Sequence, residues 1–347
     1  MRHRWCKRIV EGRAAATTFA WPRGRSNGVA IAGDIVVTLL QGTTMPDERT
    51  AFASSAAVDH ADEAHRHGVS AGRNDPHDDA HRDEKEAEER SSPSGKVVYR
   101  AILQEGEEEL GRTTAALFWS GLAAGLSMGF SMVAEGLLRN YLPDADWRPL
   151  VAKLGYSAGF LIVVLGRQQL FTENTLTPIL PLLQRKPHAT LGNVLRLWCT
   201  VLIANLLGAL VFAWVTVRTP AFDPTIQAMF VELGREAMTN GPATTALRAI
   251  FAGWLVALMV WLLPFAEAAR VWVIILLTYL IALGGFAHVI AGAVETFAAA
   301  AAGEAGWTSV LLGYLVPALI GNIVGGVTLV AMVNHAQVTA GGDGDDL

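Results

Sequence analysis

Six long apolar stretches in the last two-thirds of the chain limit what it can fold into. They cover about 114–137, 154–183, 194–217, 247–264, 271–297 and 308–333. Each is close to the roughly 20 residues that an α-helix needs to cross a bilayer. Backbone that faces lipid must satisfy its hydrogen bonds within its own helix. The sequence therefore predicts an all-α integral membrane protein with six transmembrane helices.

The segments outside these stretches are of a different kind. Residues 1–44 are interpreted as an over-extended gene start, with translation beginning at Met45, or as disordered chain. Residues 45–95 are acidic and contain histidines, and they have too little apolar surface to repay ordering, so a disordered tail is expected. Residues 96–112 have helical apolar spacing, which predicts an amphipathic surface helix. The channel domain is expected over 113–335, with a disordered C-terminal tail over 336–347.

Overall charge and cysteine content exclude several classes. The 27 Lys and Arg against 32 Asp and Glu leave no basic surface for nucleic acid. Two cysteines cannot form a disulfide framework. No serine in a span is accompanied by the acid and base of a hydrolase, so we expect no enzyme activity, no cofactor and no metal. With six spans both termini lie on one side, and the Lys and Arg count slightly favours the cytoplasm of the inner membrane.

The second and fifth spans are interrupted near their middles. The second contains the polar run Gly166–Asn174 followed by two prolines, and the fifth contains Gly284, Gly285 and His288. These breaks occupy the same place in two three-span halves, which is the sequence sign of an inverted repeat with a binding site at the bilayer midplane. A half-helix beginning near Thr172, with Thr172 as its N-cap, and another after His288 would direct two positive helix ends toward one cavity. Such a cavity suits a small anion.

His288 is the ionisable group at this predicted centre. Ionisable side chains inside a membrane are functional candidates, and imidazole changes charge near neutral pH. The alternative is a structural histidine that bonds a neighbouring helix. Two further alternatives stay open: Arg167 and Glu173 form either vestibule groups or a simple ion pair, and Tyr156 and Phe160 form either a constriction or core packing.

At these residues the sequence resembles the formate/nitrite transporter family, as a divergent subgroup. The motifs are Leu170-Phe171-Thr172 with Asn174, the run from Gly285 to Ala291 around His288, and Asn322 followed by two glycines. The resemblance implies a pentamer of aquaporin-like protomers, each with its own pore for small weak-acid anions such as formate or nitrite. It places Leu170 and Phe171 at a constriction and Thr172 opposite His288, with Glu173 and Asn174 beside them. Arg167, Tyr156, Phe160 and Asn322 are expected in a vestibule or constriction.

The sequence departs from the family pattern in three ways. Arg167, Gln168 and Gln169 stand where the family usually has a glycine, a small residue and an acid. Gly253 stands where many formate-type members have an asparagine, and no lysine follows Lys186. The prediction is a proton-linked channel for small monovalent anions in the lipid bilayer. The alternative is a channel for neutral solutes such as water or glycerol.

Overall fold

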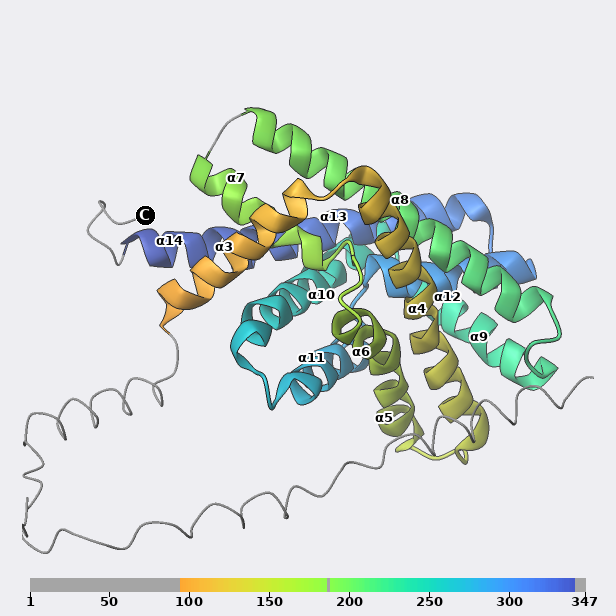
Figure 1. Cartoon of the computed structure of the whole chain (residues 1–347). Coiled ribbons are helices and arrows are strands. Elements are labelled where there is room, and N and C mark those ends of the chain that lie inside the picture. The colour runs from red at the N-terminus through yellow and green to blue at the C-terminus, as the bar shows by residue number, and fades with distance from the viewer. Residues whose placement is uncertain (1–93, 186–187, 341–347) are drawn as a thin grey trace, which may run out of the picture. The chain divides into compact units, whose positions relative to one another are not determined.

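The computed structural model describes residues 94–185 and 188–340, and these residues are helical apart from turns and connecting loops. The predicted segment 1–44 and almost all of the predicted tail 45–95 lie outside them. The first helix of the described residues is α3 (Gly95–Gly111). Its buried Tyr99 and Ile102 pack with α7 (Ile179–Arg185) and with α14 (Val333–Ala340), the last described helix. Figure 1 shows α3 beside these two helices.

The first half contains three membrane spans. They are α4 (Thr114–Tyr141), a second span that is broken, and α8 (His188–Arg218). The second span comprises α5 (Arg148–Ala152), a 3-10 turn (Lys153–Tyr156) and α6 (Ser157–Leu165), followed after the break by a 3-10 turn (Glu173–Thr175) and α7. Glycines of α4 allow close crossing with α8, because a Cβ at Gly125 would lie 2.2 Å from the backbone oxygen of Asn205.

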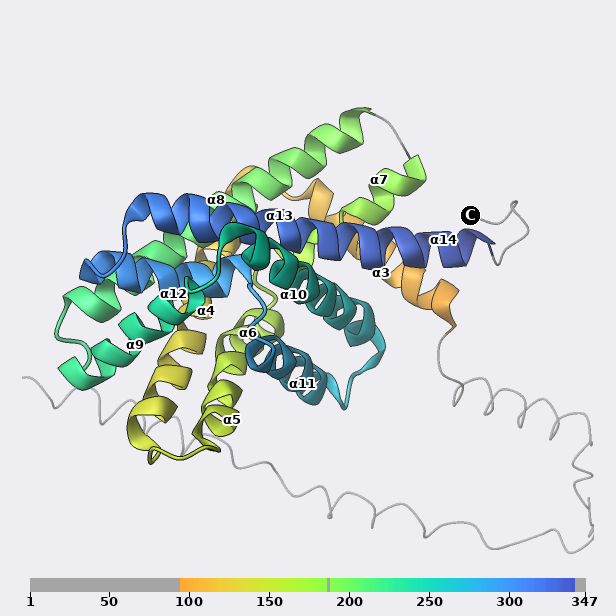
Figure 2. The ribbon, with the colours of Figure 1, turned by 180° about the vertical axis from the view of Figure 1, so that it is seen from behind.

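The second half repeats this order. Its first span is α10 (Pro242–Leu262) with a 3-10 turn (Leu263–Phe265), and its broken span is α11 (Arg270–Leu283) followed by α12 (Val289–Ala302). The last span is continuous over Ser309–Ala340, with π-helical turns Ser309–Leu315 and Gly325–Met332 on either side of α13 (Val316–Val324), ahead of α14. Figure 2 shows the helices of this half from behind.

Five helices among the described residues are long and apolar enough to cross a membrane. The remaining predicted span is present as the two shorter apolar helices Arg270–Leu283 and Val289–Ala302. Because this span is broken in its middle, neither of its two helices is long enough to cross a membrane by itself. The fold is therefore an all-α, multi-pass membrane architecture with broken second and fifth spans.

Helix α9 (Pro224–Ala237) was not predicted. Asp223 precedes Pro224 at the start of the helix, and Ile226, Phe230 and Leu233 are buried at helical spacing against α12, α4 and α8. This pattern was available in the sequence, but at 14 residues the helix is too short to be a span. α9 lies beside α12 (Figure 2).

Two predicted boundaries were wrong. The half-helix expected near Thr172 is only a 3-10 turn, and the α-helix starts at Ile179, directly after Pro178. Proline is tolerated before a helix or in its first turn, where its missing N–H would have no helical partner, but not further in. At the other end, α14 continues to Ala340 where a disordered tail had been expected from residue 336. Tyr99 on α3 contacts His335 there at 2.8 Å, which joins the two helices.

Candidate functional site at the two helix breaks

The two breaks have the same backbone hydrogen bonds. Gly166, Arg167 and Gln168 donate N–H groups to Ile162, Val164 and Val163 at 2.9, 3.2 and 3.0 Å. Gly284, Gly285 and Phe286 donate to Leu280, Ala282 and Ile281 at the same three distances. The paired residues are separated by a constant number of positions, so the two loops are equivalent parts of a repeat.

An asparagine from the third span of each half holds its break. Asn205 Oδ1 accepts the N–H of Phe171 at 2.9 Å, and its Nδ2 donates to Gly121 and Gln169 carbonyls at 2.7 and 2.9 Å. Asn322 Oδ1 accepts the N–H of Val289 at 2.8 Å, and its Nδ2 donates to Ala249 and Ala287 carbonyls at 2.8 and 2.9 Å. Both side chains are fully buried.

These bonds change the interpretation of Asn322. It is expected in a vestibule or constriction, but its side chain bonds the backbone of the second break and does not line the three cavities described below. Asn205 was missed. A single asparagine in the apolar run LIANLLGAL was the available signal, because a polar side chain inside a span needs a partner.

His288 and Thr172 meet between the two breaks. His288 Nε2 lies 2.8 Å from Thr172 Oγ1, and His288 Nδ1 accepts the N–H of Ala291 at 3.1 Å. Because Nδ1 is an acceptor, we assign the ring proton to Nε2, which then donates to Thr172. The hydroxyl proton of Thr172 is left to donate to another acceptor. The Thr172 hydroxyl does not cap the following turn, contrary to the N-cap prediction.

The constant spacing of the two loops places Leu170 opposite His288 in the repeat. The Leu170 carbonyl accepts N–H groups from Glu173 and Asn174 at 3.1 and 3.2 Å. In the second half the His288 carbonyl accepts the N–H of Gly292 at 2.9 Å, and the His288 ring accepts the N–H of Ala291. His288 is thus both the N-cap of α12 and the polar member of a pair whose other member is apolar.

Aromatic and apolar side chains enclose this pair. The Phe160 ring lies edge-on to His288 at 5.0 Å between centroids, and Tyr156 lies 5.4 Å from Phe160. Leu170 and Phe171 are buried, and Phe171 contacts the Trp198 ring. His288 itself is 1% exposed. The centre is therefore closed in this conformation, with its hydrogen-bond donors surrounded by apolar surface.

A cavity of about 710 Å³ reaches the first break from the α3 side. Its lining includes Glu105 and Glu109 of α3 and the predicted residues Arg167 and Glu173. No ion pair joins Arg167 to Glu173 among the described residues, and Glu173 Oε1 is buried without a hydrogen-bond partner. Asn174 Nδ2 donates to Gln169 Oε1 at 2.9 Å. We name this space the Glu109 cavity.

Glu109 connects α3 to the first break. It accepts hydrogen bonds from Gln169 Nε2, at 3.1 Å, and from the Thr177 hydroxyl. Burial raises the pKa of Glu109 to about 7, although these two donors act in the opposite direction. The family pattern has an acid at position 169, where this chain has Gln169. The carboxyl beside the first break is supplied here by Glu109 of α3. Neither sequence motif pointed to Glu109.

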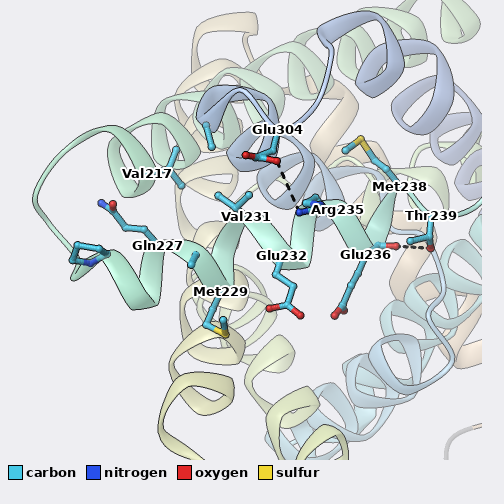
Figure 3. A pocket seen from close by; sticks show the side chains of 13 residues that line it. Val217, Gln227, Met229, Val231, Glu232, Arg235, Glu236, Met238, Thr239 and Glu304 are labelled. Carbon is cyan, nitrogen blue, oxygen red and sulfur yellow. Dashed lines mark hydrogen bonds and ion pairs between the residues drawn. The ribbon is translucent and has the colours of Figure 1, made fainter.

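A smaller cavity of about 170 Å³ reaches the second break from the other side. Tyr156, Arg248, Gly285 and Glu295 are among its lining residues, and we name it the Arg248 cavity. A third cavity, of about 970 Å³, lies instead along α9, where Arg235 pairs with Glu304 at 3.9 Å (Figure 3). It contains none of the predicted site residues. No cluster of His, Cys, Asp and Glu that could hold a metal is present in the described part of the chain.

Gly253 departs from the family pattern for a reason that the packing shows. A Cβ at Gly253 would lie 2.3 Å from the backbone oxygen of Asn322, just as one at Gly125 would meet Asn205. The position is therefore a helix-crossing point in this chain and leaves no room for an asparagine side chain.

Comparison with known proteins agrees with this arrangement. The formate/nitrite transporter family model matches residues 96–336. The inner membrane protein YfdC of Escherichia coli (strain K12) is 40% identical over 274 residues, which cover 75% of this chain and 88% of YfdC. A probable formate transporter of Methanothermobacter thermautotrophicus is 25% identical over 259 residues, covering 69% and 88%.

Two solved structures have the same fold. A pentameric formate channel with formate bound is 20% identical with a TM-score of 0.55, covering 65% of this chain and 97% of that one. An ion channel of the same family is 16% identical with a TM-score of 0.62, covering 70% and 99%. Members of the formate/nitrite transporter family are membrane transport proteins and not enzymes. The chain belongs to the formate/nitrite transporter family.

Proposed function

We propose that this protein is a channel for small monovalent weak-acid anions, with formate and nitrite as the first candidates, and that transport is linked to protons through His288. The carrying observation is the contact of His288 Nε2 with Thr172 Oγ1, which lies between cavities that approach from opposite sides. We also propose a pentamer in the inner membrane, with both termini in the cytoplasm. In that orientation the Glu109 cavity is cytoplasmic and the Arg248 cavity is external.

The closed centre supports a proton-linked mechanism. A bare anion loses its hydration in an apolar constriction, which is unfavourable, whereas the neutral acid loses much less. The Nε2–H group of His288 and the hydroxyl of Thr172 can donate hydrogen bonds to an anion at the entrance of this region. At that entrance the anion takes up a proton that comes from the entry-side solution by way of His288. It then crosses as the neutral acid and releases the proton into the solution on the other side. Net transport then moves one proton with each anion.

The test is uptake into proteoliposomes that contain the full-length protein. We expect labelled formate or nitrite to accumulate under an inward proton gradient and to stop accumulating when the gradient is abolished. His288→Asn should abolish proton-linked uptake while leaving the oligomer intact in size-exclusion chromatography. Unchanged uptake by this variant would remove His288 from the mechanism. Swelling with glycerol or water in place of anion uptake would support the neutral-solute alternative.

A further inference from the structure

The Arg248 cavity contains an arginine that makes no ion pair among the described residues. The cavity has four charged lining residues, which are Lys153, Glu236, Arg248 and Glu295. Lys153 pairs with the buried Glu135 at 2.9 Å, and Glu236 pairs with Arg139 at 2.7 Å. Arg248 is half-buried and makes no ion pair or hydrogen bond within the described residues. Its guanidinium is therefore available to a ligand.

A buried hydroxyl in the same cavity is also without a partner. Thr245 is 2% exposed, and its Oγ1 has no hydrogen bond in the described structure. Thr245 and Arg248 lie three residues apart on α10, so both side chains are on one face of that helix. A hydroxyl is rarely buried without a partner, and one that lines a cavity is expected to bond whatever occupies the cavity.

Arg248 lies next to the second break. A Cβ placed at Gly285, where φ is +58°, would come 3.2 Å from Arg248 Nη1. The absence of a side chain at this position leaves room for the guanidinium over the loop that leads to His288. An anion held by Arg248 would therefore be close to the entrance of the central site.

We propose that Arg248 and Thr245 form a binding site for a small monovalent anion, which holds the anion before it reaches His288. The proposal rests on the proposed anion transport and adds to it the residues that capture the substrate. A cavity of about 170 Å³ accepts an anion of a few non-hydrogen atoms, since one water molecule occupies about 30 Å³ of liquid.

Two measurements on the purified full-length protein test the site. The first is the shift of its unfolding temperature in detergent by sodium formate, relative to sodium chloride at equal ionic strength. The second is the KM for formate uptake in proteoliposomes. We expect Arg248→Gln to remove the formate-dependent shift and to raise KM about tenfold or more, because it deletes a charge-assisted hydrogen bond. Thr245→Val should raise KM less.

Controls separate this site from general charge effects and from the transport step. Arg235→Gln removes an arginine from the exposed surface of α9, and we expect it to change neither readout. Arg248→Lys keeps the charge and should retain part of the shift if Arg248→Gln does not fold. His288→Asn should retain the shift although uptake is lost.

The outcomes distinguish the two proposals. If the wild-type protein shows the shift and Arg248→Gln does not, the site is supported even when no uptake is measured, and only the transport proposal fails. If uptake is present and neither the shift nor KM changes in Arg248→Gln and Arg248→Lys, the site is wrong and the transport proposal is retained.

Discussion

Asn205 and Asn322 perform the same task in the two halves of the molecule. Each amide oxygen accepts an N–H from the equivalent position of its break, from Phe171 at 2.9 Å and from Val289 at 2.8 Å. Each amide nitrogen donates to a carbonyl of the loop and to a carbonyl of the first span in its half. We call each of these sets of side-chain hydrogen bonds an asparagine clamp. The two clamps hold the irregular backbone on which the central site depends.

Removing one clamp should destabilise the protein. Asn205→Leu leaves the N–H of Phe171 and the carbonyls of Gly121 and Gln169 without their side-chain partner in a buried region. Each unsatisfied group costs about 1–3 kcal/mol, so a loss of several kcal/mol is expected. Thermal unfolding in detergent measures it. Asn193→Leu, at an exposed position of the same helix, is the matched control and should change little; equal effects of both variants would contradict the clamp.

The left-handed residue in each break gives a second prediction. Arg167 has a φ of 49°, and its repeat equivalent Gly285 has a φ of 58°. This conformation is strained for a residue with a Cβ and unstrained for glycine. We expect Arg167→Gly to maintain or raise the unfolding temperature, and Gly285→Ala to lower stability by about 1–2 kcal/mol.

A glycine without these constraints is the control for this pair. A Cβ at Gly313 meets nothing within 4 Å, so Gly313→Ala should be neutral or slightly stabilising. A lower unfolding temperature for Arg167→Gly than for the wild type would show that the arginine side chain contributes more than its backbone strain costs.

Much of the fold was readable from the sequence because its main signals are local. Apolar length gave the spans, and the polar run after Gly166 and the glycines before His288 gave the two breaks, since lipid tolerates neither. The contact between Thr172 and His288 was implied by the family motifs, not by the spacing. Asn205 and Glu109 were not found, because each acts through partners distant in sequence. Arg248 was not found, because the cavity that it lines is formed by segments distant in sequence. The start of α7 was misplaced because Thr172 bonds His288 in preference to capping a helix.

Close packing at Gly253 gives a third prediction. Gly253→Ala would place a Cβ 2.3 Å from the backbone oxygen of Asn322, which is rigid and cannot move aside at low cost. We expect α10 and the last span to separate, with a loss of about 2 kcal/mol or more in stability. Thermal unfolding with Gly313→Ala as the reference checks this. Wild-type stability in Gly253→Ala would mean that the two helices are not in close contact.

The carboxyl of Glu109 gives a prediction about pH. Its pKa is raised to about 7 in the folded protein by burial, whereas an ordinary glutamate has a pKa of 4.5. The folded state therefore holds this proton over a pH range in which the unfolded state releases it. The stabilisation is complete below about pH 4.5 and is lost as pH rises through about 7. Unfolding temperatures measured between these two values should fall with increasing pH.

Glu109→Gln should remove that component of the pH dependence, because the amide does not titrate, and its one oxygen can still accept a hydrogen bond from Gln169 or from Thr177. Glu108→Gln is the matched control, since Glu108 is exposed on the same helix and accepts a hydrogen bond only from Gln104 among the described residues. Its unfolding curve should follow that of the wild type. Hydrogen exchange over Gly95–Gly111 locates the effect, and equal pH profiles for wild type and Glu109→Gln would show that the carboxyl does not hold α3 to the first break.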